Sequence, residues 1–127
     1  MRQLKFSITT DANGNGNATW VFNGFALNAY AVPGGGAVAT WDFTIVAPPE
    51  AGVTPRTLLT ATNVGTSAVD YPLQVQGKDA TGTAISGTYL FPPVCGALTV
   101  TVSGGGNGVT YSIYVIVLDS DARDGTT

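Results

Sequence analysis

Apolar and polar residues alternate along much of this chain. In one short segment, for example, Leu4, Phe6 and Ile8 are separated by Lys5 and Ser7. A period of two places alternate side chains on opposite faces, which is the pattern of a half-buried β-strand. No segment of ten or more residues shows a helical period of 3.6. The alternation predicts strands at residues 3–10, 18–23, 25–32, 37–47, 57–62, 71–76, 85–91, 97–103 and 109–118.

Clusters of glycine, proline and asparagine separate these runs. Such residues favour turns because glycine and asparagine tolerate positive φ and proline interrupts strand pairing. The clusters lie at residues 11–17, 33–36, 48–52, 77–82, 91–94 and 103–108. Short strands joined by such turns predict an all-β fold: a single β-sandwich, with the jelly roll as one variant, of about eight or nine strands. We assign residues 1–118 to this domain and residues 119–127 to a polar C-terminal tail.

The last predicted strand differs from the others because it is apolar on both faces from Tyr111 to Leu118. A strand of this kind is covered on both sides. We therefore expect it to be central in the fold, or to have one face covered by a partner chain. We also expect it to form a hairpin with residues 97–103 through the glycine-rich segment 103–108.

Composition narrows the functional classes. The chain has 127 residues, 44% of them hydrophobic and only 10% charged, whereas about 25% are charged in an ordinary soluble domain. A surface with so few charges is easily buried against another protein, which favours assembly.

The net charge is −3, and the five basic residues are scattered, so we expect no nucleic-acid binding. We expect no membrane span either, since no apolar run reaches 18 residues. Residues 1–20 lack the apolar core of a signal peptide, which predicts synthesis in the cytoplasm.

The segment DANGNGN at residues 11–17 begins like a calcium-binding EF-hand loop, with oxygen ligands at alternate positions followed by glycine. Such a loop needs a glutamate at its twelfth position, and that position is Phe22. Its flanks also alternate like strands rather than helices. We therefore predict the tip of a hairpin between residues 3–10 and 18–23, and no metal requirement.

Catalytic signatures are missing from the sequence. Cys95 is the single cysteine and the chain contains no histidine, so the thiol lacks its usual base and is expected to be a small buried residue. Residues 103–108 are glycine-rich but precede a strand, whereas a phosphate loop precedes a helix. Asp42 alternates with apolar neighbours and is expected to face solvent. These observations predict a protein that is not an enzyme and has no cofactor.

Aromatic residues leave one alternative open. They are frequent enough to form a sugar-stacking platform on a β-sandwich, although core and interface positions fit their alternation better. The residues concerned are Trp20, Tyr30, Trp41, Tyr71, Tyr89, Tyr111 and Tyr114.

The segment ITTDANGNGNATW at residues 8–20 resembles the start of small structural proteins of tailed bacteriophages. The resemblance continues in the same order with TLLTATN at 57–63, YPLQV at 71–75, GKDATGTA at 77–84 and LTVTVSGGGN at 98–107. It covers most of the chain and departs at residues 33–38 and 48–55. It implies a virion protein encoded near the head genes, without cofactor or catalytic residue.

Together these features predict a capsid decoration or cement protein in the phage head. The alternatives are a head–tail connector, a tail component and a carbohydrate-binding module. The expected partners are the major capsid protein or other virion proteins and further copies of the chain, with a trimer favoured. Both termini are expected to serve as arms. The predicted contact residues are Met1, Arg2, Gln3, Tyr111, Tyr114, Asp119 and Asp121.

Overall fold

The computed structural model describes residues 1–47 and 56–119, and all regular structure in them is β-strand. Alternating sequence patterns thus form strands throughout, as predicted. The strands are β1 (Arg2–Thr9), β2 (Gly16–Pro33), β3 (Asp42–Ala47), β4 (Arg56–Ala61), β5 (Val69–Pro72), β6 (Val75–Lys78), β7 (Ala84–Leu90), β8 (Pro93–Ser103) and β9 (Thr110–Asp119).

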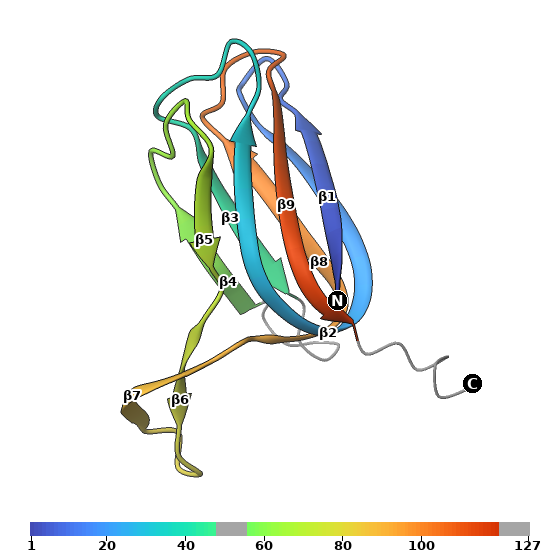
Figure 1. The fold of residues 1–127 in the computed structure, drawn as a ribbon. Helices are drawn as coiled ribbons and strands as arrows, with labels where there is room; N and C mark the ends of the chain where they lie inside the picture. The colour runs from blue at the N-terminus through green and yellow to red at the C-terminus, as the bar shows by residue number, and fades with distance from the viewer. Residues whose placement is uncertain (48–55, 120–127) are drawn as a thin grey trace, which may run out of the picture.

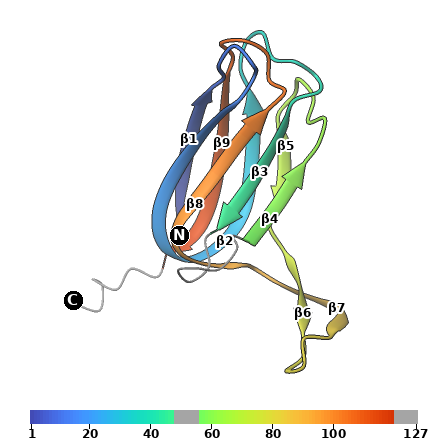
Figure 2. The same cartoon turned by 180° about the vertical axis from the view of Figure 1, so that it is seen from behind.

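Seven strands form one open antiparallel sheet in the order β1-β9-β2-β8-β3-β4, with β5 paired to β2. The long strand β2 belongs to both halves of this sheet. Residues 16–25 pair with β8, and residues 24–33 pair with β9. β2 curves between the two halves and folds the sheet into two facing layers (Figure 1; Figure 2). The all-β prediction is therefore confirmed, and the arrangement is consistent with a β-sandwich.

The core lies between the two layers and is built from the alternating apolar residues of the strands. An aromatic cluster occupies part of it, because Trp41 packs against Tyr111 with ring centroids 4.2 Å apart and against Phe43 at 5.4 Å. The polar atoms of this cluster are satisfied: Trp41 Nε1 donates to the carbonyl oxygen of Gly65 at 2.7 Å. At one edge, Trp20 Nε1 on β2 donates to the carbonyl oxygen of Lys5 on β1, linking the layers.

Several strand boundaries differ from the predictions. The predicted strands 18–23 and 25–32 are one strand, because β2 continues through Gly24. Residues 37–41 belong to a turn rather than to β3, with the amide of Trp41 donating to the carbonyl of Val38. The predicted strand 71–76 is divided between β5 and β6, which lie in different sheets.

Two predicted hairpins are wrong. β1 pairs with β9 and the first half of β2 pairs with β8, so residues 10–15 connect the two layers. The segment between β8 and β9 also crosses between layers, since β8 pairs with β2 and β3. These two connections pack together: the amide of Gly105 donates to the carbonyl of Gly14 at 3.0 Å. The glycines of residues 103–108 thus allow close approach between backbones.

Candidate functional site: an arm beside an apolar groove

β6 and β7 form a separate two-stranded sheet that stands away from the sandwich (Figure 1). We call residues 75–90 the arm. Every residue of β7 is exposed, including Ile85 (42%) and Tyr89 and Leu90 (58% each). A lone two-stranded hairpin is only marginally stable in water, and a third strand or a packed apolar face is needed to support it. The arm would therefore be stabilised by packing its exposed apolar side chains against another chain.

Backbone hydrogen bonds to β2 hold the chain on either side of the arm, next to a bulge in that strand. The pairing of β2 with β9 shifts between Ala26 and Asn28, so Leu27 is left out of that ladder. The carbonyl oxygen of Leu27 accepts the amide of Leu73 at 3.1 Å, and the amide of Ala26 donates to the carbonyl oxygen of Pro92 at 3.1 Å. Bulges often redirect chains at functional positions. Here both ends of the arm are fixed to adjacent residues of one strand.

The tip of the arm is a turn with hydrogen bonds to the side chain of Asp79. Its Oδ1 atom accepts the Thr81 hydroxyl at 2.7 Å and the amides of Thr81 and Thr83 at 2.9 and 3.0 Å. The Thr81 hydroxyl, followed by the two amides, lowers the pKa of this carboxyl. Asp79 is therefore ionised at neutral pH and carries its charge on an exposed tip.

DANGNGN contains the same kind of turn. Oδ1 of Asp11 accepts the amides of Asn13 and Asn15 at 2.8 and 3.0 Å, and Gly14 adopts a φ of 82°. The amides of Asn15 and Asn13 lower the pKa of the Asp11 carboxyl. The prediction of a turn is confirmed, and the Asp11 carboxylate accepts hydrogen bonds from backbone amides within it. The prediction that folding needs no metal remains a prediction.

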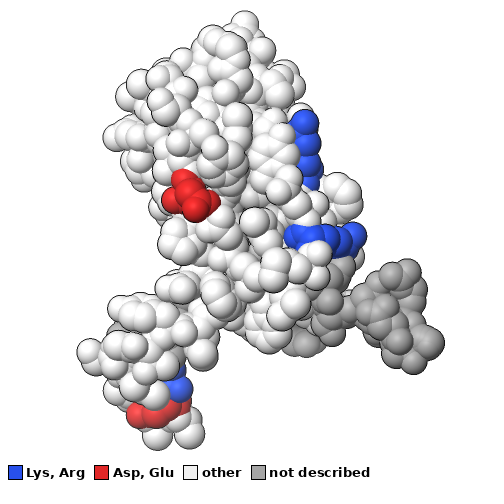
Figure 3. All heavy atoms as spheres, in the orientation of Figure 1, with Lys and Arg blue, Asp and Glu red and all other residues white. Residues whose placement is uncertain are grey.

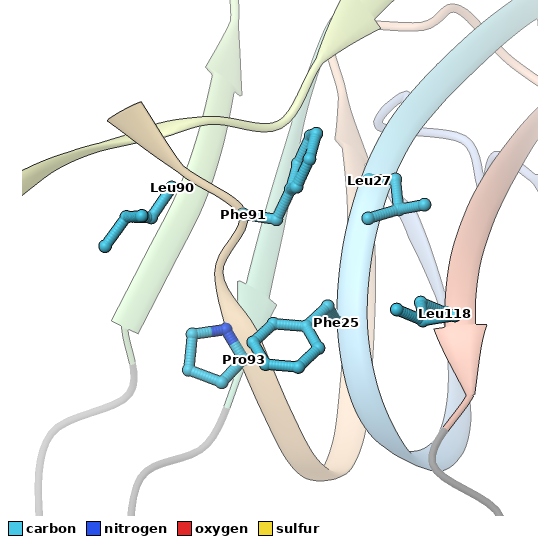
Figure 4. A pocket seen from close by; sticks show the side chains of 6 residues that line it. All are labelled: Phe25, Leu27, Leu90, Phe91, Pro93 and Leu118. Carbon is cyan, nitrogen blue, oxygen red and sulfur yellow. The ribbon is translucent and has the colours of Figure 1, made fainter. Parts of the chain in front are cut away.

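An apolar groove of about 490 Å³ lies at the base of the arm. Its lining residues are Phe25, Leu27, Leu90, Phe91, Pro93 and Leu118. Figure 4 shows the side chains of Leu90 and Phe91 on one side, those of Leu27 and Leu118 on the other, and Phe25 and Pro93 at one end. Four of the six are exposed large hydrophobic residues, namely Phe25, Leu90, Phe91 and Leu118. Open apolar surfaces of this kind mark contact sites in soluble proteins.

Charges are sparse around this region. Arg56 lies at the rim of the groove, where its guanidinium donates to the carbonyl oxygen of Pro93 at 2.7 Å. The only charged residues of the arm are Lys78 and Asp79, next to its tip. Figure 3 shows the same distribution, with red and blue together at the end of the arm and a largely uncharged surface between them and the body. Contacts here would thus be mainly apolar, with a few charges to orient them.

The predicted contact residues near the termini lie on the sandwich. Arg2 and Gln3 are part of β1 and pair with Val117 and Ile116. The prediction of an N-terminal arm is therefore wrong, because ladder hydrogen bonds hold this segment in the sheet; Met1 is exposed beside it. Asp119 is the last residue of β9 and pairs with Gly24. Asp121 and the rest of the predicted tail, residues 120–127, lie outside the described residues.

The two predicted contact tyrosines have different environments. Tyr111 is fully buried, and its hydroxyl donates to the carbonyl of Gly105 at 2.8 Å. It belongs to the core and is not available to a partner, which corrects the prediction. Tyr114 lies on the outer face of β9, half-buried, opposite Tyr30 of β2 and beside Lys5, whose Nζ is 5.7 Å from its ring centroid. β9 is central in its layer, as expected.

The proposed aromatic platform is only partly present. Trp41 and Tyr111 are in the core, so neither can stack on a sugar. Tyr30 and Tyr114 instead line a shallow hollow of about 510 Å³ on the outer face of the sheet, together with Gln3, Val32 and Ala68. Strand register, which local alternation does not define, brings these two tyrosines together.

Candidate catalytic groups lie apart from one another. Cys95 is exposed, contrary to prediction, because it alternates with the buried Val94 on β8. The carboxylate of Asp42 is half-buried and accepts the amide of Asn63 at 2.8 Å. Within residues 1–47 and 56–119, no three histidine, cysteine, aspartate or glutamate residues are grouped as a metal site. That part of the chain also contains no helix long and apolar enough to cross a membrane.

The arm and groove were not predicted as a site. The relevant signal was the apolar run from Tyr89 to Phe91, which alternation assigned to an ordinary strand. No family model, curated protein or solved structure matches the chain. The resemblance to phage structural proteins therefore stays a prediction from the sequence motifs.

Proposed function

We propose that this chain is a non-enzymatic structural protein of a phage virion, a capsid decoration or cement protein that attaches through its arm and apolar groove. The observation that carries this proposal is the arm: a hairpin with exposed apolar side chains, held at its base and extended from the sandwich. An arm of this kind suits a protein that joins other subunits, and its low charge suits burial against them.

The proposed partners are the major capsid protein or other virion proteins, together with further copies of this chain. A trimer is the favoured assembly, since a closed three-fold ring matches the three-fold positions of a shell lattice and leaves no open contact surface. The protein would be made in the host cytoplasm and function in the phage head. The motifs shared with phage structural proteins support this placement.

Quantitative mass spectrometry of purified particles tests the proposal. Hundreds of copies per particle are expected for a decoration protein. Six or twelve copies would instead favour the alternative of a head–tail connector or tail component. Absence of the chain from purified particles would contradict a virion function altogether.

A carbohydrate-binding module is the second candidate, favoured by the hollow between Tyr30 and Tyr114. Aligned tyrosines offer stacking surfaces, and Gln3 supplies a polar group beside them. A glycan array tests this candidate. Selective binding that is lost in Tyr30→Ala and retained in Tyr89→Ala, an arm variant, would support it; an array without selective signals would exclude it for the glycans displayed.

A further inference from the structure

We infer that the apolar groove of one copy receives the arm tip of a second copy of this chain. The side chain of Ile85 would enter the groove, and the Asp79 carboxylate would face the Arg56 guanidinium at its rim. This inference deepens the proposed function by naming the partner of the arm.

The arm tip and the groove have matching chemistry. Six apolar residues line the groove, and Ile85 presents a half-exposed apolar side chain near the tip. Ile85 directly follows Ala84, which pairs with Lys78 at the end of the hairpin ladder. Asp79 is therefore only a short distance along the arm from Ile85. An Ile85 side chain in the groove would thus bring Asp79 to the groove's margin.

The arm tip and the groove also offer one pair of opposite charges, Asp79 and Arg56, while Lys78 beside Asp79 has the same sign as Arg56. Asp79 is ionised, because its carboxylate accepts three hydrogen bonds within the tip. Arg56 is held at the groove by its bond to Pro93, one of the lining residues. An acid on the arm tip and a base on the groove rim would fix the direction in which the arm enters.

The arm tip is not placed to fill the groove of its own chain. Leu90 and Phe91, at the arm's base, already form one wall of that groove. The arm then leads away from the sandwich, with both ends fixed to β2 (Figure 1). A second copy supplies the same tip without bending the arm. Docking would also cover apolar surface that a lone hairpin leaves in water.

Two matched variants test this contact. Ile85→Lys damages the arm and leaves the groove intact, whereas Leu118→Lys damages the groove and leaves the arm intact. Each should weaken association at least about tenfold, as expected for residues at the centre of a contact. Thr101→Lys on β8 adds the same charge at an exposed position away from the arm and the groove, and it should associate like the wild type.

Mixing the two damaging variants gives the decisive result. The intact arm of Leu118→Lys can enter the intact groove of Ile85→Lys, so the mixture should form a species of twice the 12.9 kDa chain mass by light scattering. Neither variant should do so alone. A contact between two arms or between two grooves would not be restored by mixing. A wild-type monomer at every concentration, or a mixture that stays monomeric, would overturn the inference.

The charge pair can be tested separately. Asp79→Asn keeps an oxygen that can accept the turn's hydrogen bonds, so the tip should fold, and Arg56→Gln removes the opposite charge. Each should weaken association about two- to fivefold, and the double variant should be no weaker than either single one. Additive losses would contradict the pairing. All of these measurements use the purified protein, so a failed contact and an absence from virions are separate outcomes.

Discussion

The amide of Leu73 donates a hydrogen bond to the carbonyl oxygen of Leu27, 3.1 Å away, at the residue where β2 leaves its ladder with β9. This bond connects the fold to the proposed function. The bond extends the pairing of β2 with β5 by one residue, since Asn28 pairs with Pro72, and it fixes the chain just before the arm. The Leu27 side chain meanwhile lines the groove. Leu27 therefore contributes to both parts of the site, with its carbonyl oxygen holding the chain that leads into the arm and its side chain lining the groove.

Replacing Leu73 with alanine should destabilise the whole domain. Its side chain is 1% exposed, and removing a buried leucine costs about 2–5 kcal/mol of unfolding free energy. Leu90→Ala is the matched control, because that side chain is exposed and its loss should cost no more than about 0.5 kcal/mol. Urea denaturation measures both values. Equal losses in the two variants would contradict a contribution of the buried Leu73 side chain to the core.

The two connections at one end of the sandwich should not tolerate a side chain at Gly105. An added Cβ atom there would lie 2.8 Å from Cε2 of Tyr111 and 2.9 Å from Cγ2 of Thr10. Gly105→Ala should therefore lower the unfolding free energy by about 1–3 kcal/mol through overpacking. At Gly35 an added Cβ has nothing within 4 Å, so Gly35→Ala should change stability little. Thermal unfolding of both variants tests this difference.

The two aspartate turns should contribute differently to the loss of the domain's stability at acid pH. The folded pKa of Asp11 is below its ordinary value of 3.8, so the unfolded chain takes up a proton at higher pH than the folded chain. The resulting stabilisation is present above about pH 4 and is lost as pH falls through the folded pKa. Asp11→Asn cannot ionise, and its melting temperature should fall less between about pH 7 and pH 3 than that of the wild type.

Asp79→Asn is the control for that experiment. The pKa of the Asp79 carboxyl is also lowered. Asp79, however, lies on the arm, which pairs only within its own two-stranded sheet. Opening of the arm need not unfold the sandwich, so this variant should retain the acid response of the wild type. Identical pH profiles for the wild type and Asp11→Asn would rule out a stabilising role for the ionised Asp11 turn.

Alternation in the sequence predicted strand positions well, because burial of every second residue is a local property. It predicted Leu4, Phe6 and Ile8 to be on one face, and all three are buried. Which strands pair with one another was harder to predict, since strand pairing depends on contacts between distant segments. DANGNGN thus folds into a turn as predicted but joins two layers, because β1 and β2 find different partners.

The candidate site was harder to predict for the same reason. Residues 85–91 alternate like any half-buried strand, and nothing local shows that the sandwich leaves them outside. The groove combines Phe25, Leu118 and Pro93, which are distant in sequence and meet through the pairing of β2 with β8 and β9. Tyr111 was assigned to a contact because its strand is apolar on both faces, yet its position in the alternation places it inward.

Hydrogen exchange of the arm at different protein concentrations reports directly on whether the arm docks in a second copy. Docking of the arm in a second copy should slow exchange of the amides in residues 75–90 at high concentration, while dilution should restore fast exchange. The sandwich strands should remain protected throughout, and Ile85→Lys should exchange rapidly at every concentration. Exchange of the arm that is the same at all concentrations would mean that no second copy covers it.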